Sequence, residues 1–247
     1  MKPYYEHAGV RLFHADCRDV LPSLPGGRNG GPKLLLTDPP YGVGMSTTNH
    51  RQRALAMATI ANDQPADRSV IEMCLDEAWS RLDFYGHAYV FGPFDLARLP
   101  HAAGVCELVW DKQFPTMGDI EHPWGKQHEF IQFAIRMDGA VNGKRGGAAA
   151  RRRGGSVLRH PRPNGSGAKH HISEKPVSLL RELIEMSSRH GDLVLDPFAG
   201  SGSTLVAAVI EGRRAVGIEL EEPWCEVAAK RLDDLTRQVG LFGGVGI

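Results

Sequence analysis

The sequence predicts a doubly wound α/β fold built on a mostly parallel, seven-stranded sheet. Short apolar runs that end in polar or turn residues alternate with longer stretches in which apolar residues recur near the helical period. This alternation places helices on both faces of a parallel sheet, whose strands are then apolar throughout. The 247 residues suffice for one such domain and are few for two, so residues 1–247 are expected to form a single domain.

Each predicted strand is followed by polar or turn-forming residues. The predicted strands are residues 10–13, 34–36, 88–91, 108–110, 130–135, 193–195 and 215–218. Helices are predicted between them because apolar residues there repeat about every 3.6 positions, and Pro176 suits the first turn of one of them. The predicted helices are residues 69–82, 177–187, 204–210 and 224–235.

The charges balance overall but are unevenly distributed. Lys and Arg number 29, as do Asp and Glu, so the net charge does not indicate an anionic partner. Residues 139–173 contain no acidic residue and are rich in Gly, Arg and Pro. Such a segment is expected to form an inserted surface loop that is either a linker or a basic patch for a polyanion.

The cysteines and the apolar runs indicate the cellular compartment. The cysteines are scattered and lack metal-ligand spacing, so no metal site is expected. The polar start of the chain does not resemble a secretory signal, and no apolar run approaches the roughly 20 residues that a membrane helix needs. We therefore expect a soluble protein of the reducing cytoplasm, without a membrane partner.

The tetrapeptide Asp38-Pro39-Pro40-Tyr41 follows the predicted strand 34–36. Its two prolines hold the backbone extended and remove both amide donors, so the turn offers only hydrogen-bond acceptors. A carboxylate beside a backbone carbonyl can hold both hydrogens of an amino group, and Tyr41 offers a face for stacking a planar group. The alternative interpretation is a strand end with a capping Asp38 and a packed Tyr41.

A glycine-rich turn, residues 196–204, follows the predicted strand 193–195, and the next predicted strand ends at Glu219. Glycines between a buried strand and a helix let a ligand approach the helix N-terminus, and an acid after the next strand can accept both hydroxyls of a ribose. A dinucleotide fingerprint requires Gly or Ala at position 205, where this chain has Leu205. The turn therefore favours a nucleoside ligand without pyrophosphate over NAD or FAD.

These motifs, in this order, resemble the amino-methyltransferases of DNA, specifically the beta-ordered N6-adenine/N4-cytosine group. Residues 38–41 are similar to the target-amine motif of this family, and residues 191–204 resemble its S-adenosylmethionine loop. Residues 170–176 resemble the segment before the cofactor strand, and residues 212–231 resemble the ribose-binding strand with its following helix. The resemblance covers most of the chain. Further segments similar to this family are Asp16-Cys17, residues 110–112 and residues 128–131. The chain departs from the family at Ser203, where a Thr is usual, and at Trp224, where a Tyr is usual.

The resemblance implies a role for each motif residue. The catalytic residues are expected to be Asp38, Pro39, Pro40 and Tyr41. The cofactor is expected to be S-adenosyl-L-methionine, bound by Asp16, Cys17, Lys175, Asp196, Phe198, Gly200, Ser201, Gly202, Thr204 and Glu219. The basic segment 139–173 takes the place of the family's DNA-recognition region, with Arg151, Arg152, Arg153 and Arg159 as expected DNA-binding residues. Structural roles only are expected for Asp63, His128 and Glu129.

The target motif precedes the cofactor motif, which is a circularly permuted order for this Rossmann-like fold. If the strands that end before Asp38 and Asp196 are central neighbours, their connections leave to opposite faces and open one crevice. The strand that ends near Glu219 would then lie beyond the cofactor strand, with residues 10–13 next to it at the edge of the sheet.

The resemblance implies in-line methyl transfer to N6 of adenine in a base flipped out of double-stranded DNA. Asp38 favours adenine because the N4-cytosine members more often carry Ser at this position, and N4 of cytosine is the alternative. Methylation of RNA or of a protein glutamine, an inactive DNA-binding protein and an NAD oxidoreductase are further alternatives. The expected setting is the bacterial cytoplasm, for a host or phage gene, and a homodimer and a cognate restriction endonuclease are left open as partners.

Overall fold

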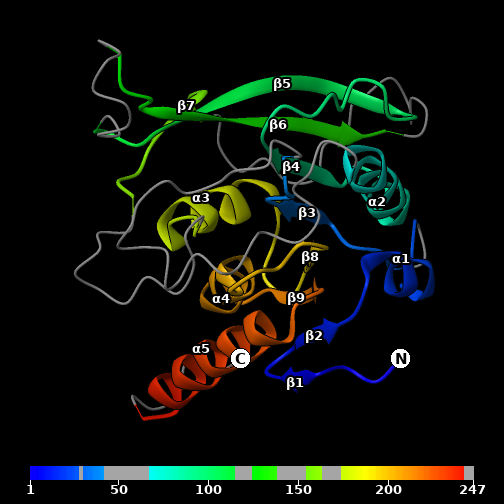
Figure 1. Cartoon of the computed structure of the whole chain (residues 1–247), viewed down its shortest axis with the longest axis vertical. Coiled ribbons are helices and arrows are strands. Elements are labelled where there is room, and N and C mark those ends of the chain that lie inside the picture. Colours follow the sequence, from blue (N-terminus) through cyan, green and yellow to red (C-terminus); the bar gives the residue numbers. More distant parts are fainter. Residues whose placement is uncertain (28–29, 42–66, 115–123, 138–153, 163–173, 242–247) are drawn as a thin grey trace.

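The computed structural model describes residues 1–27, 30–41, 67–114, 124–137, 154–162 and 174–241. These residues form a nine-stranded sheet in the order β1-β2-β9-β8-β3-β4-β6-β5-β7 (Figure 1). The strands are β1 (Tyr5–His7), β2 (Val10–His14), β3 (Leu34–Thr37), β4 (His87–Phe91), β5 (Ala102–Asp111), β6 (His128–Arg136), β7 (Val157–Arg159), β8 (Leu193–Asp196) and β9 (Arg214–Glu219).

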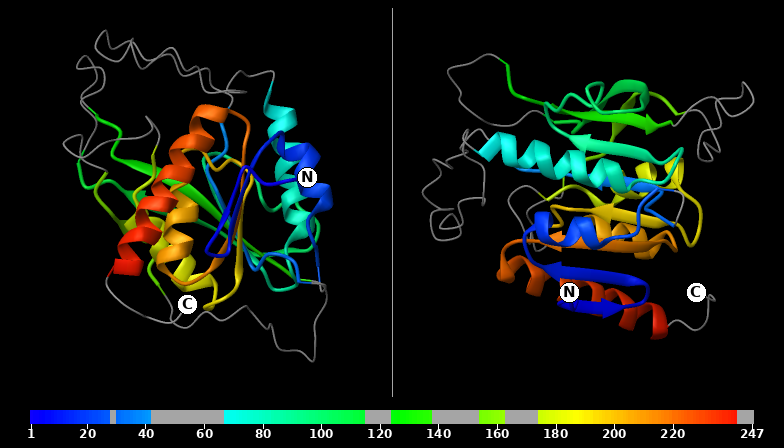
Figure 2. Two further views of the ribbon diagram at one scale, coloured as in Figure 1. Left: turned by 90° about the horizontal axis from the view of Figure 1, so that it is seen from below. Right: turned by 90° about the vertical axis from the view of Figure 1, so that its right-hand side faces the viewer.

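Helices cover both faces of the sheet, as the alternating pattern predicts. Helices α3, α4 and α5 lie on one face, and α1 and α2 lie on the other (Figure 2). Their bounds are α1 (Cys17–Val20), the 3-10 helix η1 (Leu21–Ser23), α2 (Arg68–Arg81), α3 (Val177–Ser187), α4 (Ser203–Ile210) and α5 (Glu222–Leu241). Among the described residues, no helix is long and apolar enough to cross a membrane.

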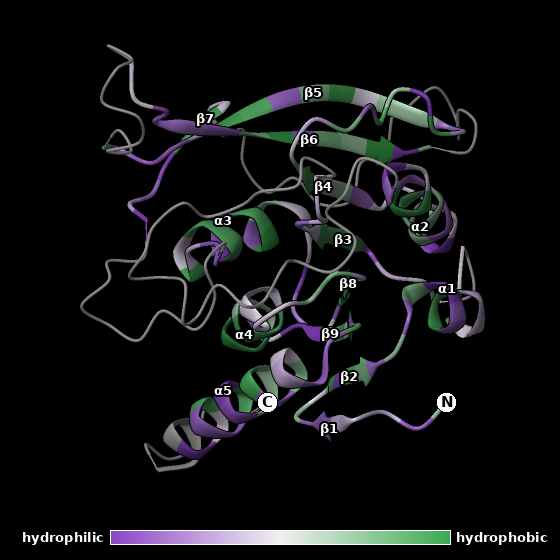
Figure 3. Cartoon of the chain, in the orientation of Figure 1, coloured by the Kyte–Doolittle hydropathy of each residue, from purple (hydrophilic) through white to green (hydrophobic). Residues whose placement is uncertain are grey.

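The sheet lies between two apolar cores because the side chains of each strand alternate between its faces. In β3, Leu34 and Leu36 join the core under α3 and α4, while Leu35 joins the core under α2. All three are at most 1% exposed, so leucine side chains of β3 are buried on both faces of the sheet. Figure 3 colours the ribbon of the chain by the hydropathy of each residue. The doubly wound, mostly parallel fold is therefore confirmed, with β2, β9, β8, β3 and β4 running in parallel.

The number of strands differs from the prediction. Strand β1 pairs with β2 and takes its place at the edge of the sheet, and β7 pairs in parallel with β5. The prediction that residues 139–173 form only a loop was thus wrong for Val157–Arg159. Leu158 anchors this strand because its side chain is buried beside Trp110, whose Nε1 donates to the carbonyl of His160 at 2.8 Å.

The carboxyl ends of the central parallel strands meet at one edge of the sheet. Leu35 of β3 is in register with Leu195 of β8, and His14 of β2 is in register with Glu219 of β9. The two predicted motifs therefore end neighbouring strands, in the strand order that the sequence predicts. This edge is where a ligand binds in an open α/β sheet.

Candidate active site

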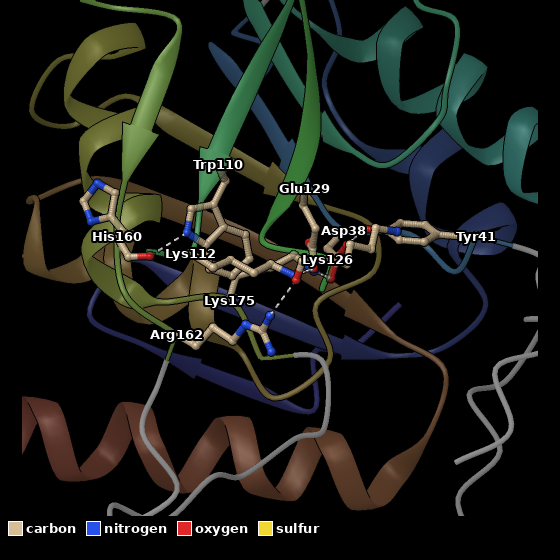
Figure 4. Close-up of polar contacts among 9 residues, drawn as sticks. All are labelled: Asp38, Tyr41, Trp110, Lys112, Lys126, Glu129, His160, Arg162 and Lys175. Atoms are coloured by element: carbon tan, nitrogen blue, oxygen red, sulfur yellow. Dashed lines mark hydrogen bonds and ion pairs between the residues drawn. The ribbon is translucent and has the colours of Figure 1, made fainter. Parts of the chain in front are cut away.

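The Asp38 turn begins where β3 ends, and its carboxylate is held by two donors. Lys175 Nζ lies 2.5 Å from Asp38 Oδ2, and the hydroxyl of Tyr41 donates to Asp38 Oδ1 at 3.0 Å (Figure 4). Pro39 is buried and Pro40 partly buried, so the prolines fix the backbone that carries this carboxylate. The side chain of Asp38 remains 25% exposed and is therefore accessible to a ligand.

The ring of Tyr41 packs against the end of β4. A Cβ at Gly92 would lie 2.5 Å from Tyr41 Cε1, and Gly92 has a φ of +96°, so glycine is required here. The ring also meets Phe94 edge-on, at 6.4 Å between centroids. Burial, together with the nearby charge of Asp38, raises the pKa of the Tyr41 hydroxyl, which therefore stays a donor to Asp38.

Two lysines and a glutamate extend the site beyond Asp38. The same Lys175 Nζ lies 3.3 Å from Glu129 Oε2, and Lys112 Nζ donates to Glu129 Oε1. Burial lowers the pKa of Lys175, but the charges of Asp38 and Glu129 outweigh it and raise the pKa overall. Burial raises the pKa of Glu129, but the two lysines outweigh it and lower the pKa overall. Burial lowers the pKa of Lys112, although the charge of Glu129 opposes this. Basic and acidic groups thus alternate from Lys112 through Glu129 and Lys175 to Asp38.

Asp196 joins the glycine-rich loop to β3. Its Oδ1 accepts from Thr37 Oγ1 at 2.7 Å and from the amide of Phe198 at 3.1 Å, and Thr204 is a further hydrogen-bond partner. Burial raises the pKa of Asp196 to about 6 although these hydrogen bonds oppose it. The phenyl group of Phe198 is partly buried and packs against the core on the α2 face.

Glu219, at the end of β9, holds the next part of the loop. Its carboxylate accepts from the amide of Gly200 at 2.8 Å and from the amide of Glu221 at 2.8 Å. Burial raises the pKa of this carboxyl group. Gly202 precedes α4 with a φ of +79°, and a Cβ there would lie 2.7 Å from Ala228 Cβ of α5. The loop thus needs glycine at position 202 both for its backbone conformation and for its packing.

Leu205, which departs from the dinucleotide fingerprint, is fully buried. Its side chain lies on Gly217 of β9, where an added Cβ would approach Leu205 Cδ1 to 2.8 Å. Close approach of helix and strand is therefore achieved by a glycine in the strand instead of one in the helix. This arrangement explains how a leucine is accommodated at this position.

Arg231 of α5 clamps the loop from outside. Its guanidinium donates to the carbonyl of Ser201 at 2.7 Å and to the hydroxyl of Ser203 at 3.1 Å. It also forms an ion pair with Glu174 at 2.7 Å, and both side chains are at most 13% exposed. Because Glu174 precedes Lys175, this ion pair ties the glycine-rich loop to the lysine that contacts Asp38.

Asp16 and Cys17 lie after β2, which is parallel to β9. The carboxylate of Asp16 caps α1 by accepting from the amide of Arg18 at 2.9 Å, and the bond from the Arg18 side chain lowers the pKa of Asp16. Cys17 is buried, and its Sγ lies 2.8 Å from the Sγ of Cys74. Ligand-type atoms of Asp16, Cys17 and Cys74 thus lie within 4.8 Å of one another, a grouping that the spacing of the cysteines did not predict.

Of the residues expected to bind DNA, one lies in the described part of the chain. Arg159 is on β7 with its side chain 69% exposed, 3.7 Å from Asp111. Arg151, Arg152 and Arg153 lie outside the described residues. The structure thus brings the predicted catalytic and cofactor residues to one edge, and it places Arg159 on the edge strand β7.

Sequence reasoning missed several residues that the structure brings to this edge. Glu129 was expected to have only a structural role, yet it contacts Lys175. The available signal was the position of charged residues at the ends of apolar strands, but nothing in the sequence states which strands are neighbours. The residues missed in this way are Thr37, Lys112, Glu129, Glu174 and Arg231.

Comparison with known families fits this geometry. The family model of the N6/N4 DNA methylases matches residues 33–230, a span that includes the Asp38 turn, the glycine-rich loop and Glu219. The chain belongs to this DNA methylase family. The methylase is 31% identical over 245 residues to YubD of Escherichia coli (strain K12), itself named as a methylase, and the match covers 92% of each chain.

Other similarities are more local or concern the fold. The methylase is 43% identical over 65 residues to the DNA adenine methyltransferase YhdJ of Escherichia coli (strain K12), covering 26% of this chain and 22% of that protein. The crystal structure of the M1.HpyAVI–SAM complex matches with a TM-score of 0.62 at 18% identity, over 91% of this chain and 99% of the other. The cytosine-N4-specific PvuII DNA methyltransferase matches with a TM-score of 0.65 at 16% identity, over 96% and 95%. These structures share the fold.

Proposed function

We propose that the methylase transfers a methyl group from S-adenosyl-L-methionine to N6 of adenine in DNA. The observation that carries this proposal is that the Asp38 turn and the glycine-rich loop end the adjacent strands β3 and β8, joined by the Thr37–Asp196 hydrogen bond. One edge therefore offers acceptors for an amino group beside a loop suited to a nucleoside. The M1.HpyAVI complex with SAM and the name of YhdJ support the cofactor and the base.

Two features of the loop fit a nucleoside cofactor. The space beside Gly200 is open, because an added Cβ would meet no atom within 4 Å, and the buried carboxylate of Glu219 lies against this backbone. When bound, the cofactor supplies a methyl group on a sulfonium, which is a strong electrophile. We assign its binding to Asp16, Cys17, Lys175, Asp196, Phe198, Gly200, Ser201, Gly202, Thr204 and Glu219.

The residues of the Asp38 turn prepare the amino group. The lone pair of this nitrogen is delocalised into the base and is a poor nucleophile. Asp38 and the carbonyl of Pro39 accept its two hydrogens, which directs the lone pair out of the ring plane. Asp38 also stabilises the positive charge that develops on nitrogen as the C–S bond breaks and the N–C bond forms, and the nitrogen then loses one of its hydrogens as a proton to solvent. Positioning and electrostatics therefore supply the catalysis. Tyr41 holds the base after it leaves the stack.

The choice between adenine and cytosine rests on Asp38. The N4-cytosine members that this chain resembles more often have Ser at this position, which favours adenine. N4 of cytosine is the second candidate, because the cytosine-N4-specific PvuII enzyme shares the fold.

Residues 139–173 supply the DNA contacts in this proposal. Arg159 is exposed on β7, and Arg151, Arg152 and Arg153 lie in the same acid-free stretch of sequence. Basic side chains bind DNA by neutralising phosphates, which positions the duplex without reading its sequence. Double-stranded DNA is therefore the proposed partner.

The test is a methyl-transfer assay with a chemical readout. The purified protein is incubated with isotopically labelled S-adenosyl-L-methionine and genomic DNA from a methylation-deficient host, and the digested nucleosides are analysed by mass spectrometry. Labelled N6-methyldeoxyadenosine is expected. Labelled N4-methyldeoxycytidine would overturn only the choice of base, whereas the absence of label from both nucleosides would overturn the proposal.

A further inference from the structure

The charges beside Asp38 form a short chain across four elements. Lys112, at the end of β5, pairs with Glu129 of β6, Glu129 pairs with Lys175 before α3, and Lys175 pairs with Asp38 after β3 (Figure 4). The side chains of Lys112 and Lys175 are only 9% and 8% exposed. Isolated buried charges are costly, so each lysine needs a carboxylate partner to remain in place.

The two oxygens of Glu129 are not equivalent. Lys112 donates to Oε1, which fixes the orientation of the carboxylate. Oε2 is buried and lies 3.3 Å from Lys175 Nζ, a longer contact than the 2.5 Å from Lys175 Nζ to Asp38 Oδ2. A buried carboxylate oxygen gains from a shorter charge-assisted hydrogen bond, so Oε2 is an acceptor that can take Lys175 more closely.

The observed position of Lys175 opposes the proposed chemistry. Its ammonium group lies 2.5 Å from the carboxylate that is assigned to the target amino group. A cation at this distance cancels much of the field of Asp38, and the amino nitrogen becomes positive as the methyl group arrives. Asp38 can stabilise that charge fully only after Lys175 moves away.

We propose that Glu129 is a positioning residue that takes over Lys175 from Asp38 when the target amino group binds. The ammonium of Lys175 lies between the two carboxylates, so it can change partners without leaving the buried cluster. Lys112 keeps Glu129 in place during this exchange. The inference rests on the proposed function, because it assumes that Asp38 accepts the amino group of a base.

The test is the rate of a single turnover at saturating cofactor, on genomic DNA from a methylation-deficient host. Glu129→Gln keeps the size of the side chain but removes the charge that receives Lys175. We expect methyl transfer to slow by roughly ten- to a hundredfold, as for groups that orient a directly acting residue. Cofactor affinity, measured by calorimetry, should change less than about twofold, and the midpoint of thermal unfolding identifies loss of the fold.

A second substitution separates this exchange from a merely structural role. In the Glu129→Gln background, Lys175→Met removes the cation that would otherwise stay on Asp38, so the double variant should be faster than Glu129→Gln alone. A structural role predicts the opposite, because the second change removes another buried contact. A wild-type rate for Glu129→Gln, or a double variant slower than that single variant, would overturn the inference.

A structural measurement on the unaltered protein remains decisive if Glu129→Gln does not fold. In a complex with S-adenosylhomocysteine and a DNA duplex, Lys175 Nζ should lie closer to Glu129 Oε2 than to Asp38 Oδ2. An ammonium that stays on Asp38 beside a bound base would overturn the exchange. If the wild-type protein methylates no DNA, the proposed function is wrong. If the wild type methylates DNA but Lys175 does not change partners, only the role proposed for Glu129 is wrong.

Discussion

The hydroxyl of Thr37 donates a 2.7 Å hydrogen bond to the carboxylate of Asp196, across the central strands β3 and β8. Burial raises the pKa of Asp196 to about 6, well above its ordinary 3.8, so the folded protein binds a proton more tightly than the unfolded chain. The stability that this proton contributes is complete below pH 4 and is lost as the pH rises through 6.

Asp196→Asn should remove this pH dependence. As the pH rises from 5 to 7.5, ionisation of Asp196 should lower the free energy of unfolding of the wild type by about 1 kcal/mol. The variant should not show this decrease. Urea unfolding of both proteins at the two pH values measures the difference, and comparison with the variant cancels the other titrating groups. If the free energies of unfolding of wild type and variant differ by the same amount at both pH values, Asp196 is ionised throughout this range.

Asp38→Ala should stop methylation while preserving the fold and cofactor binding. Loss of one contact to a charge that develops in the transition state typically costs about 100- to 1000-fold in rate. Methyl transfer to DNA and calorimetric titration with S-adenosyl-L-methionine measure the two effects. Asp76→Ala is the matched control, because Asp76 pairs with Arg98 in an exposed ion pair. Similar rates for the Asp38 variant and the wild type would exclude Asp38 from catalysis.

Gly92→Ala should displace Tyr41 and weaken methylation. The added Cβ would overlap the Tyr41 ring in a backbone conformation that disfavours alanine, and we expect a loss of roughly 1–3 kcal/mol of stability. Gly191→Ala separates the two causes, since Gly191 has a φ of +81° but open space around its Cα. Equal losses of stability and rate in both variants would show that the contact with Tyr41 contributes nothing.

Arg231→Met should destabilise the fold and loosen the cofactor loop. Breaking a buried ion pair typically costs about 3–5 kcal/mol, because Glu174 keeps a buried charge without this partner. Adding Glu174→Gln should restore part of the loss. Arg237→Met is the control, since Arg237 lies on the same helix in an exposed pair with Asp234. Chemical unfolding and cofactor titration of the three proteins test this, and an unaffected Arg231→Met would refute the clamp.

Replacement of Arg151, Arg152 and Arg153 with Ala should weaken DNA binding to a similar extent for all sequences. Each lost phosphate contact lowers the salt dependence of binding, so the slope of log affinity against log salt should fall by up to about three units. Arg189→Ala is the control, because Arg189 is an exposed arginine that precedes β8 and lies outside residues 139–173 in the sequence. Unchanged affinity and slope would identify the segment as a linker.

The sequence predicted most of the architecture because each buried strand is a short apolar run before a recognisable turn. Helix α3 spans residues 177–187 as predicted, since Pro176 marks its start. Strand β1 was missed because Tyr5–His7 has no apolar period and is largely exposed. Strand β7 was missed because three residues between Gly- and Pro-rich stretches give too short a pattern to recognise.

Contacts in the site depend on strand order and register, which a single sequence does not contain. The motifs placed Asp38, Asp196 and Glu219 correctly at strand ends, because their position follows from the local pattern. The pairing of Glu129 with Lys175 depends on β6 lying antiparallel beside β4, with Phe91 opposite Ile131. The contact between Cys17 and Cys74 likewise joins α1 to α2 across a gap in sequence that no local pattern spans.

The pairing of β2 with β9 affects how the chain can fold during synthesis. After Val10–His14 has been synthesised, its parallel partner Arg214–Glu219 is made only after about two hundred further residues. Until then, the edge of β2 that pairs with β9 has no partner, and α5, which follows β9, is not yet present to pack against the sheet. Long-range parallel pairing of this kind makes folding slow and exposes strand edges. The unpaired edge of β2 is therefore expected to stay open to other contacts until β9 has been translated.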